Sequence, residues 1–184
     1  MRSIFLFLIC FLAISFVSAQ EKNESLSILK SPENWRSELI PFPLSFAPEI
    51  DFTGVEDIRF AKGWNDQESP EFWAYAFVWY LENDPQLSDS RLQELMKLYY
   101  YGIMGVDNTV ALFLPSGDGH FIGRVQTHDR FFTKQPLLLN IRVETSYCTK
   151  QKRHLVLFQL SPQAFDHAVW ESFQEVEIAV DCGE

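Results

Sequence analysis

Cysteine, histidine and glycine-based motifs are scarce in this sequence, and their scarcity excludes several kinds of site. The chain has 3 Cys and 4 His, and no second Cys or His pair stands at the spacing that metal ligands need. No Gly-x-Ser-x-Gly elbow occurs, and the segment 116–119 lacks the Lys and helix that follow a phosphate-binding loop. We therefore expect neither a metal site nor a cofactor.

Positive charge is also in short supply. The chain has 15 Lys and Arg against 25 Asp and Glu, which gives a formal net charge of -10 at pH 7. A nucleic-acid-binding surface needs clustered Lys and Arg to neutralise phosphates, so this balance argues against nucleic acid as a partner. The same charge argues against binding to an anionic membrane surface and favours solubility.

Long apolar runs are absent except at the N-terminus. Arg2 precedes an apolar run from Ile4 to Val17, which Ser18 and Ala19 end with small side chains. This is the three-part pattern of a secretory signal, and the run is shorter than the ~20 residues of a membrane-spanning helix. We predict cleavage after Ala19, a secreted or periplasmic protein, and no membrane span after cleavage. An uncleaved N-terminal anchor is the alternative.

Two cysteines remain after the predicted cleavage, Cys148 and Cys182. An even count in an oxidising compartment predicts a disulfide. Closing a loop of this length would stabilise the fold by roughly 3–4 kcal/mol in the chain-entropy model. Two unpaired thiols are the alternative.

Aromatic residues are abundant, at 15% of the chain with 17 Phe and 5 Trp, which rules out a disordered protein. They are densest in the segment 72–81, FWAYAFVWYL, where both alternating sets of side chains are apolar. A strand that is apolar on both faces is usually covered on both sides, so we expect a central strand here.

The remaining pattern predicts a flexible leader over 20–33 and a single α+β domain over 34–184. Prolines in the segment 35–48 exclude a helix and a central strand there, and favour an extended edge segment. Further strands are expected at 55–60, 110–114, 120–131, 137–147, 154–160 and 176–180, and amphipathic helices at 90–103 and 165–173. The fold class is thus a mostly antiparallel sheet with two amphipathic helices, and the order of elements suggests two related strand-strand-helix-strand units.

One candidate site is a polar face of the expected strand 120–131. Alternation along this strand puts His120, Arg124 and His128 on one side, and Glu144 of the next strand could lie beside them. Such a face could bind an anionic ligand, or His120, His128 and Glu144 could perform acid–base catalysis. The alternative is the solvent face of an antiparallel sheet. The two histidines are roughly 26 Å apart on a straight strand, too far to share one metal ion.

A second candidate site is a pocket between the helices and the aromatic strand. Trp64 and Trp73 lie close to carboxylates in the sequence, and exposed aromatics of this kind suit an apolar or sugar-like ligand. The alternative is that these aromatics form the packed core. The candidate ligand-binding residues are Arg59, Trp64, Glu71, Trp73 and Arg124.

The function predicted from these patterns is that of an exported, non-catalytic domain that binds a small molecule or a protein partner. The alternative is a secreted hydrolase that uses the His/Arg/Glu sheet face, so the sequence leaves enzymatic activity undecided. A protein partner would dock on the proline-containing segment 41–48.

Overall fold

The computed structural model describes residues 27–183, so the expected signal sequence and the cleavage site after Ala19 lie outside the described residues. The strands are β1 (Leu29–Lys30), β2 (Arg36–Pro41), β3 (Gly54–Phe60), β4 (Tyr75–Leu81), β5 (Val110–Gly117), β6 (His120–His128), β7 (Pro136–Cys148), β8 (Arg153–Ser161) and β9 (Glu177–Ile178). The helices are α1 (Asp89–Met104), α2 (Val169–Ser172) and the 3₁₀ helix η1 (Phe173–Glu175).

Seven of these strands form one antiparallel sheet in the order β2-β3-β4-β8-β7-β6-β5. The chain lays down β2, β3 and β4 as one meander, crosses through α1, and lays down β5 to β8 as a second meander. The two meanders join where β8 pairs with β4, with Tyr75 opposite Leu160 and Leu81 opposite His154. The expectation of a mostly antiparallel sheet is therefore confirmed.

β4 lies at the centre of this sheet, as its two apolar faces predicted. Every residue from Tyr75 to Leu81 is buried. The strand begins three residues later than expected, because the chain at Trp73 turns with a positive φ of 56°. β2 is an edge strand that ends at Pro41, and this agrees with the extended edge segment expected there.

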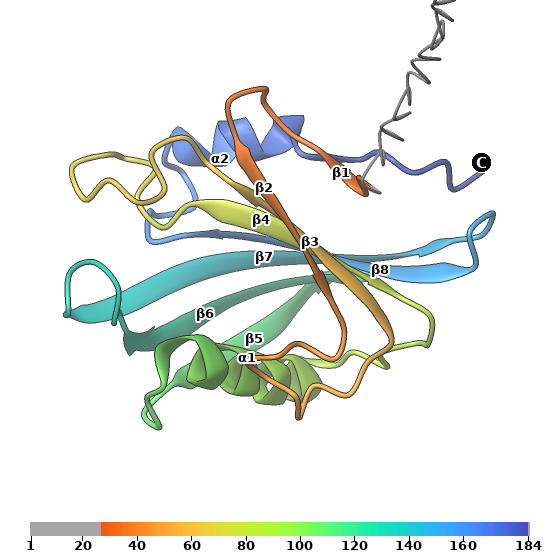
Figure 1. Ribbon diagram of the computed structural model, residues 1–184, viewed down its shortest axis with the longest axis horizontal. Helices are drawn as coiled ribbons and strands as arrows, with labels where there is room; N and C mark the ends of the chain where they lie inside the picture. Colours follow the sequence, from red (N-terminus) through yellow and green to blue (C-terminus); the bar gives the residue numbers. More distant parts are fainter. Residues whose placement is uncertain (1–26, 184) are drawn as a thin grey trace, which may run out of the picture.

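α1 covers one face of the sheet (Figure 1), and its ends follow from local chemistry. The Ser88 side chain accepts a hydrogen bond from the backbone N–H of Arg91, and Gly105 ends the helix in the left-handed conformation that glycine tolerates. Leu92, Leu95 and Tyr99 recur at helical spacing and are buried against the sheet. The helix expected at 90–103 is confirmed.

α2 and η1 lie over the opposite face of the sheet (Figure 1), where the expected helix at 165–173 forms only in part. The backbone N–H of Trp170 bonds to the carbonyl of His167, three residues back, so the segment is a series of tight turns. Arg142 explains this geometry in part, because its guanidinium stacks 5.3 Å from the Phe165 ring and 4.6 Å from Trp170. Tertiary contacts thus override the helical spacing.

The two strand-strand-helix-strand units expected from the element order are not equivalent in space. β5 follows α1 and belongs to the large sheet, whereas β9 follows α2 and pairs only with β1. Leu29 lies opposite Ile178 in that small sheet. The two halves therefore do not repeat one arrangement.

The fold begins before residue 34, the expected start of the domain. Ile28 and Leu29 are buried, and their backbone N–H groups donate to the Asp57 carboxylate at 2.8 and 3.0 Å. Arg59 pairs with Asp57 and donates to the Leu29 carbonyl. The last residues of the expected leader are thus held by a buried ion pair.

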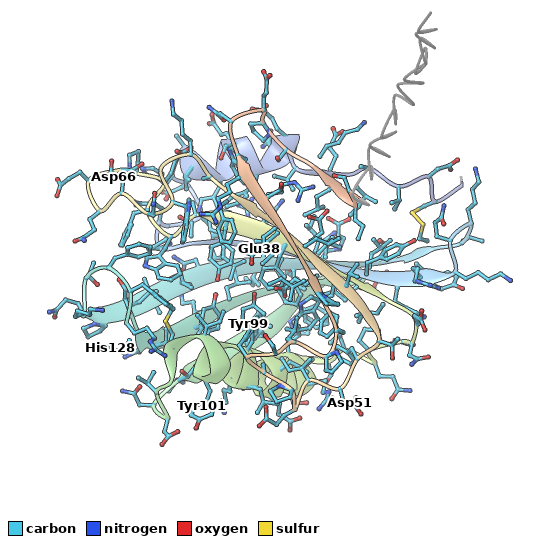
Figure 2. All side chains as sticks on the ribbon, in the orientation of Figure 1. Glu38, Asp51, Asp66, Tyr99, Tyr101 and His128 are labelled. Atoms are coloured by element: carbon cyan, nitrogen blue, oxygen red, sulfur yellow. A yellow bond between two sulfur atoms is a disulfide. The ribbon has the colours of Figure 1, made fainter. Side chains whose placement is uncertain are left out.

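The predicted disulfide is confirmed. Cys148 at the end of β7 is bonded to Cys182 in the C-terminal segment, and this appears as the yellow bond in Figure 2. The bond ties the segment after β9 to the hairpin between β7 and β8. Across residues 27–183, none of the helices has the length and apolar character needed to cross a bilayer.

Candidate functional site

A cavity of about 500 Å³ lies between α1 and the side of the sheet formed by β2, β3 and β4. Its lining is aromatic and aliphatic apart from one carboxylate, that of Glu38. The aromatic members are Phe46, Phe60, Trp64, Trp73, Tyr75, Tyr99, Phe131 and Phe132, and the aliphatic ones are Ile40, Ile58 and Ile103. We call this space the aromatic cavity.

Strand register places the sheet side of the aromatic cavity. Glu38 on β2 lies opposite Ile58 on β3, and Phe60 on β3 lies opposite Tyr75 on β4, so all four side chains share one face. α1 supplies the other wall. Figure 2 shows Tyr99 on the side of α1 that faces the sheet, and Tyr101, which is 49% exposed, on the other side.

The turn between β3 and β4 places Trp64 and Trp73 in the aromatic cavity. The backbone N–H of Trp73 donates to the carbonyl of Trp64 at 2.8 Å, which brings the two residues together. The Glu71 carboxylate accepts from the backbone N–H of Gly63 at 2.8 Å. A Cβ at Gly63 would lie 2.0 Å from the Ser69 hydroxyl oxygen, so the turn requires glycine there. Glu71 therefore supports the turn from outside the lining.

The loop between β6 and β7 brings Phe131 and Phe132 to the aromatic cavity, and buried Asp129 holds this loop. Its carboxylate accepts hydrogen bonds from the backbone N–H groups of Phe131, Phe132 and Thr133 and from the Thr133 hydroxyl, at 2.8 to 3.1 Å. Burial alone would raise the pKa of Asp129, but these bonds outweigh burial and lower it. The ionised Asp129 thus fixes the loop that carries Phe131 and Phe132 into the wall of the aromatic cavity.

The rings around Trp73 pack mainly edge to face. Phe132 lies 5.4 Å from Trp73 and 5.5 Å from Trp64, both centroid to centroid. Phe131 is 51% exposed at the rim, whereas Trp73 is 5% exposed. Within the described residues, the indole N–H of Trp73 has no hydrogen-bond acceptor. The Trp73 indole is therefore a buried hydrogen-bond donor set among aromatic rings.

A polar cluster lies behind Tyr99, at the inner end of the aromatic cavity. Glu56 accepts hydrogen bonds from Trp79 Nε1 at 2.6 Å and from the Tyr99 hydroxyl at 3.2 Å. Burial raises the pKa of Glu56 to about 8, against the lowering effect of these two bonds. At neutral pH the carboxyl group is therefore mostly uncharged, which suits its apolar surroundings.

Sequence analysis named Arg59 as a candidate ligand-binding residue, but the alternation of β3 places it away from the aromatic cavity. Ile58 and Phe60 face the aromatic cavity, so Asp57 and Arg59 face the opposite side of the sheet. The Arg59 guanidinium forms an ion pair with Asp57 and donates a hydrogen bond to the Leu29 carbonyl. Of the five candidate ligand-binding residues, Trp64 and Trp73 line the cavity.

Arg124 and the candidate catalytic residues lie on the other face of the sheet, away from the aromatic cavity. His120 on β6 is opposite Glu144 on β7, with Nε2 3.9 Å from the carboxylate. His128 is at the far end of β6, opposite Pro136, and Figure 2 shows it where the strands end. Arg124 donates through Nε to the side-chain oxygen of Asn140 at 2.9 Å. The structure thus joins His120 to Glu144 and separates both from His128.

The His120–Glu144 pair borders a shallow hollow of about 230 Å³ that also contains Ser116. His120 Nδ1 is 2.7 Å from the Asp118 carbonyl, and Nε2 faces Glu144. Nδ1 is therefore hydrogen-bonded, whereas the distance from Nε2 to the Glu144 carboxylate is too long for a hydrogen bond. Both side chains are more than half exposed. Among residues 27–183, no three His, Cys, Asp or Glu side chains group as metal ligands.

The lining residues that sequence analysis missed come from distant segments. Glu38 is on an edge strand, Tyr99 is on α1, and Phe131 is in the loop after β6. The stripe on α1 indicated a buried Tyr99, but no local pattern indicated which wall it would meet. Comparison of the chain with protein-family models, curated proteins and solved structures finds no match in any of the three.

Proposed function

We propose that this chain is an exported, non-catalytic binding protein that holds a small apolar ligand in the aromatic cavity. The observation that carries the proposal is an open space of about 500 Å³ lined by eight aromatic side chains. Ligand sites typically measure about 300–1,000 Å³ and combine apolar walls with a few polar groups, which this cavity matches.

The alternative that these aromatics only form the core accounts for part of the cluster. Tyr75 and Tyr99 are buried and belong to the packed core. It does not account for Phe131, which is 51% exposed, or for the unfilled volume beside Trp64. A hollow of this size that is open to solvent and lined by aromatic rings has the usual form of a small-molecule site, so it supports ligand binding.

Two substitutions on α1 test the proposal. Ile103→Trp would fill the aromatic cavity, whereas Tyr101→Trp adds the same side chain on the exposed side of the helix. We expect the neutral fluorophore N-phenyl-1-naphthylamine to bind the wild type and Tyr101→Trp, and to lose at least tenfold affinity in Ile103→Trp. Equal affinity for both variants, or no binding to the wild type, would overturn the proposal.

The segment 41–48 has less to offer a protein partner, because its apolar side chains are used within the fold. Leu44 and Ala47 are buried, and Phe46 lines the aromatic cavity. A hydrolytic role for His120 and Glu144 has less support than binding, because both side chains are more than half exposed and His128 lies at the far end of β6.

Export is part of the proposal, and the bond between Cys148 and Cys182 supports it, since disulfides persist in oxidising compartments. We expect protein purified from its own host to begin at Gln20. N-terminal sequencing and intact mass measure this. A chain that still carries Met1 in its mature form would contradict signal cleavage.

A further inference from the structure

We propose that the ligand of the aromatic cavity is an organic cation, an apolar body that carries an amine or quaternary ammonium group. This inference rests on the proposed function and adds the charge of the ligand to it. Glu38 is the one charged residue among the described residues that line the cavity, and Lys, Arg and His are absent from that lining. The space therefore offers a negative group and no positive one.

Glu38 has the position and the freedom to meet a ligand. It lies on the edge strand β2, it is exposed, and its partner Ile58 on β3 lines the same cavity. None of the ion pairs found within residues 27–183 includes Glu38. Burial is the main cause of the raised pKa of Glu56, and the negative charge of Glu38 adds to it. Glu38 is thus a carboxylate without a cationic partner beside apolar walls.

The aromatic walls favour the same sign of charge. The faces of Phe, Tyr and Trp rings are electron-rich and attract ammonium groups within about 6 Å of the ring centre. Phe60 lies two residues along β3 from Ile58, the residue opposite Glu38, and its ring is 4.6 Å from that of Trp64, centroid to centroid. Rings and carboxylate together form the environment that stabilises an alkylammonium group.

An anionic ligand, such as a fatty acid, would meet the opposite situation. Its carboxylate would lie near Glu38, and no lining side chain would neutralise it. Two cations stand near this side without belonging to the lining. Arg36 lies two residues before Glu38 on the same face of β2, and the Arg130 guanidinium is 5.6 Å from the Phe131 ring at the rim. The overall charge of -10 also repels anions as they approach.

Three probes with one naphthalene body separate the charge preference from the binding itself. They are (1-naphthylmethyl)trimethylammonium, 1-naphthylmethanol and 1-naphthylacetate, measured by titration calorimetry on the mature chain. We expect the ammonium probe to bind about tenfold tighter than the alcohol, and the acetate to bind weakest. In Glu38→Gln the ratio of ammonium to alcohol affinity should fall to about one.

The control variant is Asp51→Asn, which removes the same charge at an exposed position far from Glu38 (Figure 2) and should keep the wild-type ratio. Glu38→Lys supplies a second variant, in which the preference should reverse towards the acetate. Equal binding of all three probes, or tightest binding of the acetate, would overturn the inference that the ligand is a cation. Either result would leave the proposed function intact. Failure of every probe to bind would remove the proposed function as well.

Discussion

The carboxyl group of Glu56 accepts a hydrogen bond of 2.6 Å from the indole Nε1 of Trp79, with both side chains fully buried on neighbouring strands. No Lys, Arg or His is among the partners of Glu56, so burial dominates and raises its pKa to about 8. A carboxyl group that titrates at 4.5 when exposed therefore takes up a proton on folding at neutral pH. This makes the stability of the protein depend on pH in a definite direction.

Glu56→Gln should remove this dependence. Between pH 4.5 and about 8 the folded state binds a proton that the unfolded state releases, so the free energy of unfolding falls as pH rises through that window. Gln keeps an oxygen for Trp79 and an amide donor for the Tyr99 hydroxyl, and it carries no charge. We expect the variant to be more stable than the wild type by about 2–4 kcal/mol at pH 8, with little difference at pH 5.

Urea unfolding between pH 5 and pH 9 measures this difference. Glu49→Gln, at an exposed position, serves as the control and should follow the wild type at every pH. If Glu56→Gln tracks the wild type across the whole range, Glu56 is ionised in the folded protein and the argument fails.

Arg59→Ala should destabilise the fold and leave ligand binding unchanged. The substitution leaves the Asp57 carboxylate buried without its cation and releases the Leu29 carbonyl, which costs about 3–5 kcal/mol. Because Arg59 faces away from the aromatic cavity, the folded fraction should bind N-phenyl-1-naphthylamine with wild-type affinity. Arg36→Ala, on the exposed edge strand β2, should change stability by less than about 0.5 kcal/mol. If Arg59→Ala lost probe binding while its stability stayed unchanged, Arg59 would belong to the ligand site and the argument would fail.

Asp129→Ala should loosen the wall formed by Phe131 and Phe132. The variant loses the carboxylate that accepts four hydrogen bonds from the loop, which should cost about 2–4 kcal/mol and lower probe affinity about tenfold. The pKa of Asp129 is lowered in the folded state, so its contribution is present at neutral pH and is lost as pH falls through that pKa.

Asp66→Asn is the control for the loop, since Asp66 is exposed and its carboxylate accepts one bond, from the Glu68 N–H. Probe titration and thermal unfolding of both variants measure the two effects. A similar small change in both would mean that Asp129 does not hold the cavity wall.

Breaking the disulfide should lower the free energy of unfolding by about 3–4 kcal/mol in the chain-entropy model. The double variant Cys148→Ala and Cys182→Ala should match the reduced wild type in chemical denaturation. Adding reductant to the double variant should then change nothing. A wild type whose stability does not respond to reductant would show that Cys148 and Cys182 are unpaired in solution.

Local sequence pattern was enough to predict most strands, the first helix and the disulfide. Two-sided apolar alternation identified β4, and apolar residues at helical spacing identified α1, because both signals act over a few residues. Local pattern did not predict β1, which depends on the Asp57–Arg59 pair some 30 residues further along the chain. The second helix is shorter than predicted for a similar reason, since it packs against Arg142 of β7, a residue distant in the sequence.

The aromatic cavity shows the same division. From the sequence alone, Trp64 was predicted in a turn before the buried aromatic strand and Trp73 within that strand, because turn residues and alternation are local properties. Only the folded chain brings Glu38, Tyr99 and Phe131 to them, since strand order and register set which distant side chains share a face. A binding site assembled across a sheet depends on long-range pairing, and that pairing leaves no short motif in the chain.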